Sequence, residues 1–360
     1  MKNLFSKIAL LSLSALTLAA CGSTTESTEE ENTDEAAMEG ATDTAGDYSD
    51  TIKIVWYPNE SGADMSVSRD VIGAYVEEAT GKEVEHQLTT DYAIAIEALA
   101  NGQANLAFMG AQGYVEANNK NDKVLPLVVP SGESGTLEDA IYYSWINVKK
   151  GNEGDYANGD SYSIDNIKGK RFSFVSNSST SGFVIPTSDI MANFPDEDLS
   201  QEALMEGGED KFFSEVLFGG SHQGSAVNLL QERADLAAFC DTCVANYVEP
   251  VEGEMNAVGT TYQIREDAAD PFTSLVGEQF VSISVTPVLN APMAINTEVT
   301  SPEDQAALLE VFTGEAMNND ELIWRPEDSE ESTLFEKSGD SKFVPAEDAW
   351  FDPIRELSAQ

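Results

Sequence analysis

The sequence predicts an α/β protein built from two successive runs of alternating strands and helices. From residue 51 onwards, short apolar segments of strand-like composition alternate with segments of helical hydrophobic periodicity. The chain has 360 residues, enough for one large or two medium domains, and 41% of them are hydrophobic. Such an alternation predicts mostly parallel sheets with helices on both faces.

The first run has the order βαβαβαβ. Its strands are expected at 52–56, 83–88, 104–109 and 124–129. Its helices are expected at 65–80, at 92–100 and after the segment 110–113. Asp91 is a favoured N-cap for the second of these helices, whereas Gly81 and Asn101-Gly102 are typical of helix ends.

The second run follows a strand that leads out of the first run at 141–148. Further strands of this run are expected at 171–175, 216–218 and 234–239, and two strands at 280–288 and 293–295 are expected to return to the first run. Helices are expected at 182–193, 222–232 and 301–312. The stretch 195–210 is expected to be irregular and the stretch 325–360 to be rich in loops.

The stretch Ser176–Pro186 carries the strongest signal for a ligand. It is rich in small hydroxyl residues and follows the predicted strand 171–175. Ser, Thr and Asn cap helices, and the capped end presents free backbone N–H groups and the positive end of the helix dipole. Ser179, Thr180 and Ser181 add hydroxyl donors, so the stretch predicts a site for a small oxyanion. The alternative interpretation is a capped loop without a ligand.

Two other segments are expected near this stretch. Ligands of parallel sheets sit in the loops at the C-terminal ends of strands. Tyr57 follows the first predicted strand, and Gly110 and Gln112 follow the third. We therefore expect Tyr57, Gly110 and Gln112 to line the same site as the Ser179 cluster.

The charge of the chain limits its partners. The formal net charge is −45 at pH 7, from 64 acidic and 19 basic residues. A field of this sign disfavours nucleic acid and anionic membranes as direct partners. A small anion can still be bound where local donors outweigh the distant, salt-screened charge, so the site is expected to be rich in neutral dipoles.

The N-terminus is predicted to be a targeting segment. Residues 1–21 combine early lysines with an apolar run too short to span a bilayer, and end in Leu-Ala-Ala-Cys before Gly22. This ending resembles a bacterial lipobox, in which Cys21 is the lipidated residue; the alternative is an ordinary secretory signal with a chance cysteine. Residues 22–50 lack Lys and Arg and are expected to form a disordered acidic tether.

Cys240 and Cys243 form a C-x-x-C motif at a predicted strand–helix junction. A zinc site would need two further ligands, and the sequence has only His86 and His222 as histidines. A redox pair would need a thioredoxin-like context. Outside the membrane a local disulfide is favoured over both alternatives.

His222 and Asp241 also lie at predicted strand ends. His222 follows a Gly-Gly turn, and its ring can donate a hydrogen bond to an oxyanion. Asp241 either accepts the proton of a protonated oxyanion or caps a helix, and the cap is slightly favoured. We therefore include both residues among the candidate ligand-binding residues.

Catalysis finds little support in the sequence. The nucleophile-elbow, phosphate-loop and dinucleotide-binding glycine patterns are absent. Ser179 and Ser181 could act as nucleophiles only with His222 as base, which leaves a surface hydrolase as the alternative function. We expect no enzyme activity, no metal and no cofactor.

Four segments together resemble the periplasmic phosphonate-, phosphite- and phosphate-binding proteins of ABC importers, the PhnD-like family. The first is Ser179-Thr180-Ser181-Gly182-Phe183 followed by Pro186. The others are 90–110, 220–237 and 343–355, in the family's order and behind a lipobox. Together they cover most of residues 51–355.

The resemblance implies a type II periplasmic-binding fold of two α/β lobes, with the ligand in a cleft between them. Two crossing hinge strands would lie near 142–148 and 284–290, with one lobe at 51–145 plus 289–360 and the other at 146–288. Ser179, Thr180 and Ser181 would bind phosphoryl oxygens and His222 would donate to them.

The resemblance also implies a function and a location. The protein would be a monomeric lipoprotein, anchored through Cys21 at the extracytoplasmic face of the cell membrane, that delivers a small phosphorus oxyanion to the transmembrane subunits of an ABC permease. Ala291 stands where relatives specific for aminoalkyl phosphonates keep an acid, which favours phosphate, phosphite or another small oxyanion. A receptor of the same fold for a sulfonate is a further alternative.

Overall fold

The computed structural model describes residues 48–326, 329 and 331–359. The predicted signal peptide with Cys21 lies outside the described residues, as does the predicted tether up to residue 47. Within the described part of the chain, no helix combines the length and the apolar character needed to cross a bilayer.

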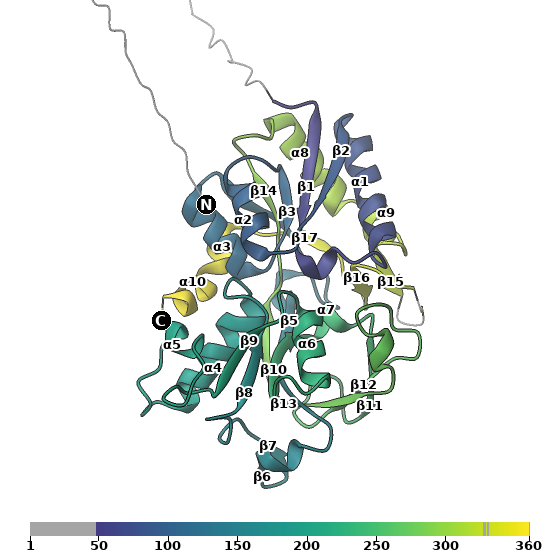
Figure 1. The fold of residues 1–360 in the computed structure, drawn as a ribbon. Coiled ribbons are helices and arrows are strands. Elements are labelled where there is room, and N and C mark those ends of the chain that lie inside the picture. The colour runs from purple at the N-terminus through teal and green to yellow at the C-terminus, as the bar shows by residue number, and fades with distance from the viewer. Residues whose placement is uncertain (1–47, 327–328, 330, 360) are drawn as a thin grey trace, which may run out of the picture. The chain divides into compact units, whose positions relative to one another are not determined.

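The first sheet has six strands in the order β17-β4-β14-β3-β1-β2 (Figure 1). They are β1 Thr51–Trp56, β2 Glu83–Leu88, β3 Leu106–Phe108, β4 Val124–Pro130, β14 Met293–Asn296 and β17 Phe343–Pro345. β2 and β3 run parallel to β1, whereas β14 lies between β3 and β4 and is antiparallel to both. The predicted parallel order of the first run is therefore confirmed, with two antiparallel strands added from later in the chain.

Helices cover both faces of the first sheet. They are α1 Ser66–Thr80, α2 Tyr92–Ala100, α3 Ala111–Lys120, α8 Pro302–Thr313, α9 Glu315–Asn318 and α10 Asp352–Ser358. Successive strand residues point to opposite faces, so Val55 packs with α2 and α3 while Ile54 and Trp56 pack with α1 and α8. The predicted start of α2 and end of α1 are confirmed: Asp91 caps α2 by accepting from the Ala93 N–H at 2.7 Å, and Gly81 ends α1 with φ +68°.

The second sheet has seven strands in the order β11-β12-β13-β5-β10-β8-β9. They are β5 Ile141–Lys149, β8 Arg171–Phe174, β9 Glu215–Phe218, β10 Leu236–Cys240, β11 Val248–Glu252, β12 Thr261–Ile264 and β13 Gln279–Leu289. Its helices are α4 Ile185–Asn193, α5 Gln201–Leu204, α6 His222–Leu230 and α7 Asp241–Val244. The short pairs β6 Ala157–Asn158 with β7 Ser161–Tyr162, and β15 Trp324–Pro326 with β16 Phe335–Lys337, lie outside both sheets.

Two long strands carry the chain between the sheets. β5 and β13 pair antiparallel along their length, from Phe280 opposite Lys149 to Leu289 opposite Ile141. β13 is followed after residues 290–292 by β14 in the first sheet. This arrangement gives the two-lobed α/β fold that the sequence predicts; the residues at which the lobes divide stay a prediction.

Some expectations from the sequence were wrong. The stretch 325–360 contains β16, β17 and α10, and β17 completes the first sheet by pairing with β4. β11 and β12 were not predicted, and the irregular stretch 195–210 contains α5. The third strand is shorter than predicted, at Leu106–Phe108. Strands of three to five residues carry too little periodicity to be recognised, and their pairing partners are distant in the sequence.

Candidate functional site

One cavity lies between the two sheets, with a volume of about 460 Å³. Residues from loops of both sheets line it, including seven of the eight predicted ligand-binding residues: Tyr57, Gly110, Ser179, Thr180, Ser181, His222 and Asp241. Gln112 is the eighth. Its side chain instead donates to Glu116 at 3.0 Å and accepts from Ser358, and only its backbone N–H reaches Thr180.

The Ser179 turn begins a helix at the end of β8. Ser179 is the N-cap, and its Oγ accepts from the Gly182 N–H at 3.1 Å. The helix therefore starts at a π-helical turn, Thr180–Val184, earlier than predicted. A Cβ on Gly182 would lie 2.3 Å from a methyl group of Val175, so glycine is required for the turn to pack against the strand end.

Thr180 joins this turn to the first sheet. Its Oγ1 accepts from the Gln112 N–H at 2.9 Å, at the start of α3. A Cβ on Gly110 would lie 3.0 Å from the same oxygen. The start of α3 and the Ser179 turn, each at the positive end of a helix, therefore meet at one wall of the cavity.

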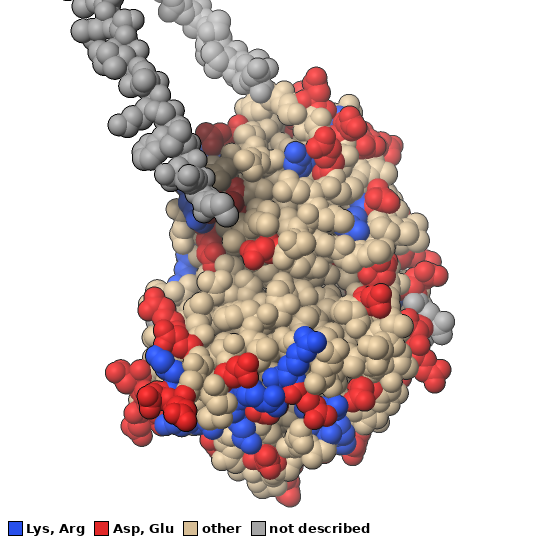
Figure 2. Space-filling view, in the orientation of Figure 1, with Lys and Arg blue, Asp and Glu red and all other residues tan. Residues whose placement is uncertain are grey.

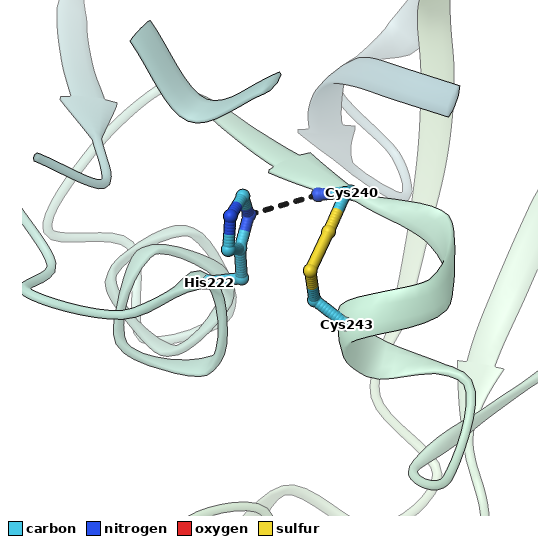
Figure 3. A group of neighbouring side chains, drawn as sticks. All are labelled: His222, Cys240 and Cys243. Atoms are coloured by element: carbon cyan, nitrogen blue, oxygen red, sulfur yellow. Dashed lines mark hydrogen bonds between the residues drawn. A yellow bond between two sulfur atoms is a disulfide. The ribbon is translucent and has the colours of Figure 1, made fainter. Parts of the chain in front are cut away.

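His222 stands at the first position of α6, which Ser221 caps by accepting from the Gly224 N–H. The backbone N–H of Cys240 donates to His222 Nδ1 at 3.0 Å (Figure 3). This bond places the ring proton on Nε2, which lies 3.4 Å from Ser179 Oγ. Burial lowers the pKa of His222 to about 3, so the ring is a neutral donor at physiological pH.

Cys240 and Cys243 are joined by a disulfide beside this ring (Figure 3). Together with His222 they form a group whose possible ligand atoms lie within 4.8 Å of one another. Both sulfurs are used in the disulfide, so the group offers no thiolate to a metal. The other histidine, His86, accepts from Trp56 Nε1 at 3.0 Å and is not among the cavity-lining residues.

Asn59 links the first sheet to His222. Its Oδ1 accepts from the His222 N–H at 3.0 Å, and its Nδ2 donates to the Tyr92 hydroxyl at 2.7 Å. The Tyr92 ring lies 4.0 Å from the Tyr57 ring, centroid to centroid. Tyr57 is only 2% exposed, and its hydroxyl has no hydrogen-bond partner among the described residues. The hydroxyl lies against Gly113 of α3, so its role as a donor to a ligand stays a prediction.

Asp241 does not have the capping role that the sequence slightly favoured. The N-cap of α7 is Cys240, and the Asp241 carboxylate instead accepts from the Tyr143 N–H at 2.9 Å and from Asn256 Nδ2 at 3.1 Å. Desolvation raises the pKa of Asp241 to about 6. The carboxylate is therefore held at the cavity wall by β5 and by the loop before β12.

The cavity wall contains no cation among the described residues that line it. None of these lining residues is Lys or Arg. Five of them carry a carboxyl group: Glu60, Glu133, Asp139, Asp241 and Glu336. Figure 2 shows that acidic side chains are spread over the visible face, whereas most of its lysines and arginines gather over the half that holds the second sheet. A bound anion would therefore be held by neutral donors alone, as the charge of the chain predicts.

Several lining residues were not predicted from the sequence. Asn59 and Glu60 follow Tyr57 in the same loop, so their place after a strand was an available signal. Tyr142 lies on β5, and Trp324 begins β15, a strand that was not predicted. Burial raises the pKa of Tyr142 to about 12, so its hydroxyl keeps its proton and can donate.

The arrangement favours binding of an oxyanion over nucleophilic catalysis. Hydroxyls, the start of two helices and the His222 Nε2–H surround the same part of the cavity. Activation of Ser179 would require His222 to accept its proton, but Nδ1 already accepts from Cys240 and Nε2 carries the ring proton. These hydrogen bonds make His222 a donor rather than a base.

The fold and the cavity are those of a solute-binding protein. Residues 54–351 match the model of the periplasmic substrate-binding protein of ABC phosphonate transporters, so the chain belongs to this family. It is a family of transport proteins.

Its relatives are distant. The chain is 30% identical to the phosphate-import protein PhnD of Mycolicibacterium smegmatis over 205 residues, which is 56% of this chain and 58% of that protein. The match thus spans little more than half of that relative.

Among the solved structures that share the fold are the following two. The binding protein of a Pseudomonas aeruginosa ABC phosphonate transporter has a TM-score of 0.60 at 18% identity, covering 85% of each chain. PhnD1 of Prochlorococcus marinus in complex with methylphosphonate has a TM-score of 0.61 at 15% identity, covering 86% of this chain and 97% of the other.

Proposed function

We propose that the protein is the solute-binding component of an ABC importer and captures a small phosphorus oxyanion between its two lobes. Phosphate, phosphite and phosphonates form the ligand class. The observation that carries the proposal is the position of Ser179, Thr180 and Ser181 beside the His222 Nε2–H in one cavity. The relatives support it, since one imports phosphate and another is complexed with methylphosphonate.

The binding chemistry uses neutral donors. Ser179, Thr180 and Ser181 would bind the phosphoryl oxygens, with Tyr57 and His222 as further donors. Asp241 is suited to accept the P–OH proton of a protonated oxyanion, since it is a carboxylate in the cavity lining. Closure of the lobes would remove water and strengthen each of these hydrogen bonds.

The remaining parts of the proposal concern location and partners. Cys21 would be lipidated and would anchor a monomer at the extracytoplasmic face of the cell membrane, where it delivers its ligand to the permease subunits. The lobes would divide into 51–145 plus 289–360 and 146–288. Mass spectrometry of the protein from its native membrane would test the anchor: a diacylglycerol adduct on Cys21 is expected, and an unmodified Cys21 would contradict it.

Calorimetry of the full chain tests the ligand class. Phosphate, phosphite and methylphosphonate form the panel, with methanesulfonate as the sulfonate alternative. We expect binding of at least one phosphorus oxyanion, weakened at least about tenfold by Thr180→Val, which removes one hydroxyl at nearly constant volume. Binding of methanesulfonate alone, or of nothing in the panel, would overturn the proposal.

The hydrolase alternative has one observation in its favour, the 3.4 Å contact between Ser179 Oγ and His222 Nε2. It predicts turnover of phosphate or acyl esters that is lost in His222→Ala. We expect no turnover above the rate of that variant, because the ring donates rather than accepts at Nε2.

A further inference from the structure

The cavity is larger than its phosphate-sized end requires. Its volume of about 460 Å³ falls within the range of roughly 300–1,000 Å³ typical of pockets for organic ligands. A single water needs only about 10–15 Å³ by the same kind of measure, and an inorganic oxyanion has five heavy atoms. Most of the space therefore lies beyond the head group.

Besides Tyr57, which is assigned to the phosphoryl end, two lining residues carry a buried side-chain atom without a hydrogen-bond partner in the described part of the chain. These atoms are Glu60 Oε2 and Trp324 Nε1. Trp324 is only 2% exposed. Buried polar groups without partners are rare because desolvation without a hydrogen bond is unfavourable, so these two atoms point to a ligand group that bonds to them.

Both side chains are held in place by contacts that leave these atoms free. The Trp324 ring packs against Phe335 and Phe343, each with a centroid separation of 5.0 Å. The buried Arg69 donates to the backbone carbonyls of Glu60 and Gly62 and not to the Glu60 carboxyl. The loop carrying Glu60 is thereby fixed, and Arg69 does not occupy the Oε2 atom of its carboxyl.

The charges restrict what the ligand group can be. With no Lys or Arg among the described lining residues, a second anionic group on the ligand would be unfavourable. An ammonium group could not accept a hydrogen bond from the Trp324 indole N–H, and burial raises the pKa of Glu60 to about 8 and so disfavours the charged carboxylate that would attract it. A hydroxyl group can both accept from an indole N–H and exchange a hydrogen bond with a carboxyl.

We propose that Glu60 and Trp324 form a second subsite, which binds the hydroxyl group of an uncharged organic substituent on the phosphorus oxyanion. The ligand class is then phosphonates or phosphate monoesters with a short, hydroxyl-bearing substituent. This inference rests on the proposed function, since it extends the same cavity from its phosphoryl end.

The test compares isosteric ligands by calorimetry on the full chain. 2-Hydroxyethylphosphonate is compared with propylphosphonate and 3-hydroxypropylphosphonate with butylphosphonate, so that a methyl group replaces the hydroxyl at two chain lengths. We expect one hydroxyl ligand to bind at least about tenfold tighter than its partner. Equal affinities within both pairs would overturn the subsite.

Variants locate the effect. The ratio of interest is the affinity for the hydroxyl ligand divided by the affinity for its methyl counterpart. Glu60→Leu and Trp324→Phe should each bring this ratio close to one. Glu60→Gln should leave it unchanged, because a neutral amide still donates and accepts hydrogen bonds. Glu209→Leu, at an exposed position outside the cavity, is the matched control and should keep the ratio. A ratio unchanged in both Glu60→Leu and Trp324→Phe would overturn the assignment; if neither variant folds, the ratio in the unaltered chain decides.

Two further ligands separate the possible failures. Methylphosphonate reports on the phosphoryl end: if it and every other phosphorus ligand fail to bind, the proposed function itself is wrong. If methylphosphonate binds but neither hydroxyl ligand is preferred, only the subsite is wrong. Tighter binding of 2-aminoethylphosphonate than of 2-hydroxyethylphosphonate would show that Glu60 is charged in the complex and would overturn the hydroxyl assignment.

Discussion

The backbone N–H of Cys240 donates to Nδ1 of His222 at 3.0 Å, and this bond decides what the histidine can do. A ring whose Nδ1 accepts carries its proton on Nε2, and Nε2 is the atom next to Ser179. The end of β10 therefore sets the tautomer of a residue on α6, and so makes the imidazole a donor within the cavity.

Two substitutions of His222 test this assignment. Glutamine can place an amide N–H near the position of Nε2, whereas asparagine reaches only the region of Nδ1. We expect His222→Asn to lower the affinity for the phosphorus oxyanion at least about tenfold, which corresponds to the loss of one hydrogen bond to a charged ligand. We expect His222→Gln to lower this affinity less. Calorimetry with the best ligand of the panel measures both; equal losses in the two variants would contradict the donor role of Nε2.

Gly113 makes room for Tyr57. A Cβ at position 113 would lie 1.8 Å from the Tyr57 hydroxyl oxygen, so Gly113→Ala must displace the ring. We expect this substitution to lower the free energy of unfolding by about 1–3 kcal/mol, as overpacked positions do, and also to weaken ligand binding.

The matched control for Gly113→Ala removes the Tyr57 hydroxyl that the new methyl group would meet. Tyr57→Phe combined with Gly113→Ala should recover part of the lost stability, as measured by urea unfolding, but not the ligand affinity. A double variant no more stable than Gly113→Ala alone would show that the clash lies elsewhere.

Glu60 predicts a specific pH dependence of stability. Desolvation raises its pKa from 4.5 to about 8 in the folded chain. Between these values the folded state holds a proton that the unfolded state has released, so stability is lost as the pH rises from about 4.5 to about 8. Glu60→Gln lacks this titration, and its stability relative to the unaltered chain should rise by roughly 3–5 kcal/mol across that interval.

Unfolding by urea at pH 5 and pH 8.5 measures this difference. Asp241 titrates in both proteins, and its contribution cancels in the comparison. Glu209→Gln, which removes an exposed carboxyl, is the matched control for the substitution itself. A Glu60→Gln variant that parallels the unaltered chain at both pH values would mean that the Glu60 carboxyl is not desolvated.

The Cys240–Cys243 disulfide closes a short loop, so its contribution to stability should be modest. The chain-entropy relation for a loop of this length gives about 2 kcal/mol. We expect Cys240→Ser with Cys243→Ser, in a Cys21→Ser background, to lower the free energy of unfolding by about this amount, and a thiol reductant to have the same effect on the Cys21→Ser chain alone. No effect of the reductant would indicate that the two thiols are not paired in the folded protein.

The sequence alone was sufficient where the signal is local. The strand at Thr51–Trp56, the helix that Asp91 caps and the glycine that ends α1 each follow from neighbouring residues. The hydroxyl cluster at 179–181 predicts a helix start with free donors for the same reason. The C-x-x-C motif favours a disulfide.

The tertiary structure decided what depends on distant segments. Nothing in the sequence places the Asn59 side chain between His222 and Tyr92, or Trp324 in the wall of the cavity, because these contacts join residues more than thirty positions apart through the packing of two sheets. The tautomer of His222 depends on a backbone N–H eighteen residues away. Local patterns determine which elements form and which residue types they carry, whereas hydrogen-bond partners, burial and protonation states arise only in the folded chain, within one lobe for His222 and Cys240 and between the lobes for His222 and Asn59.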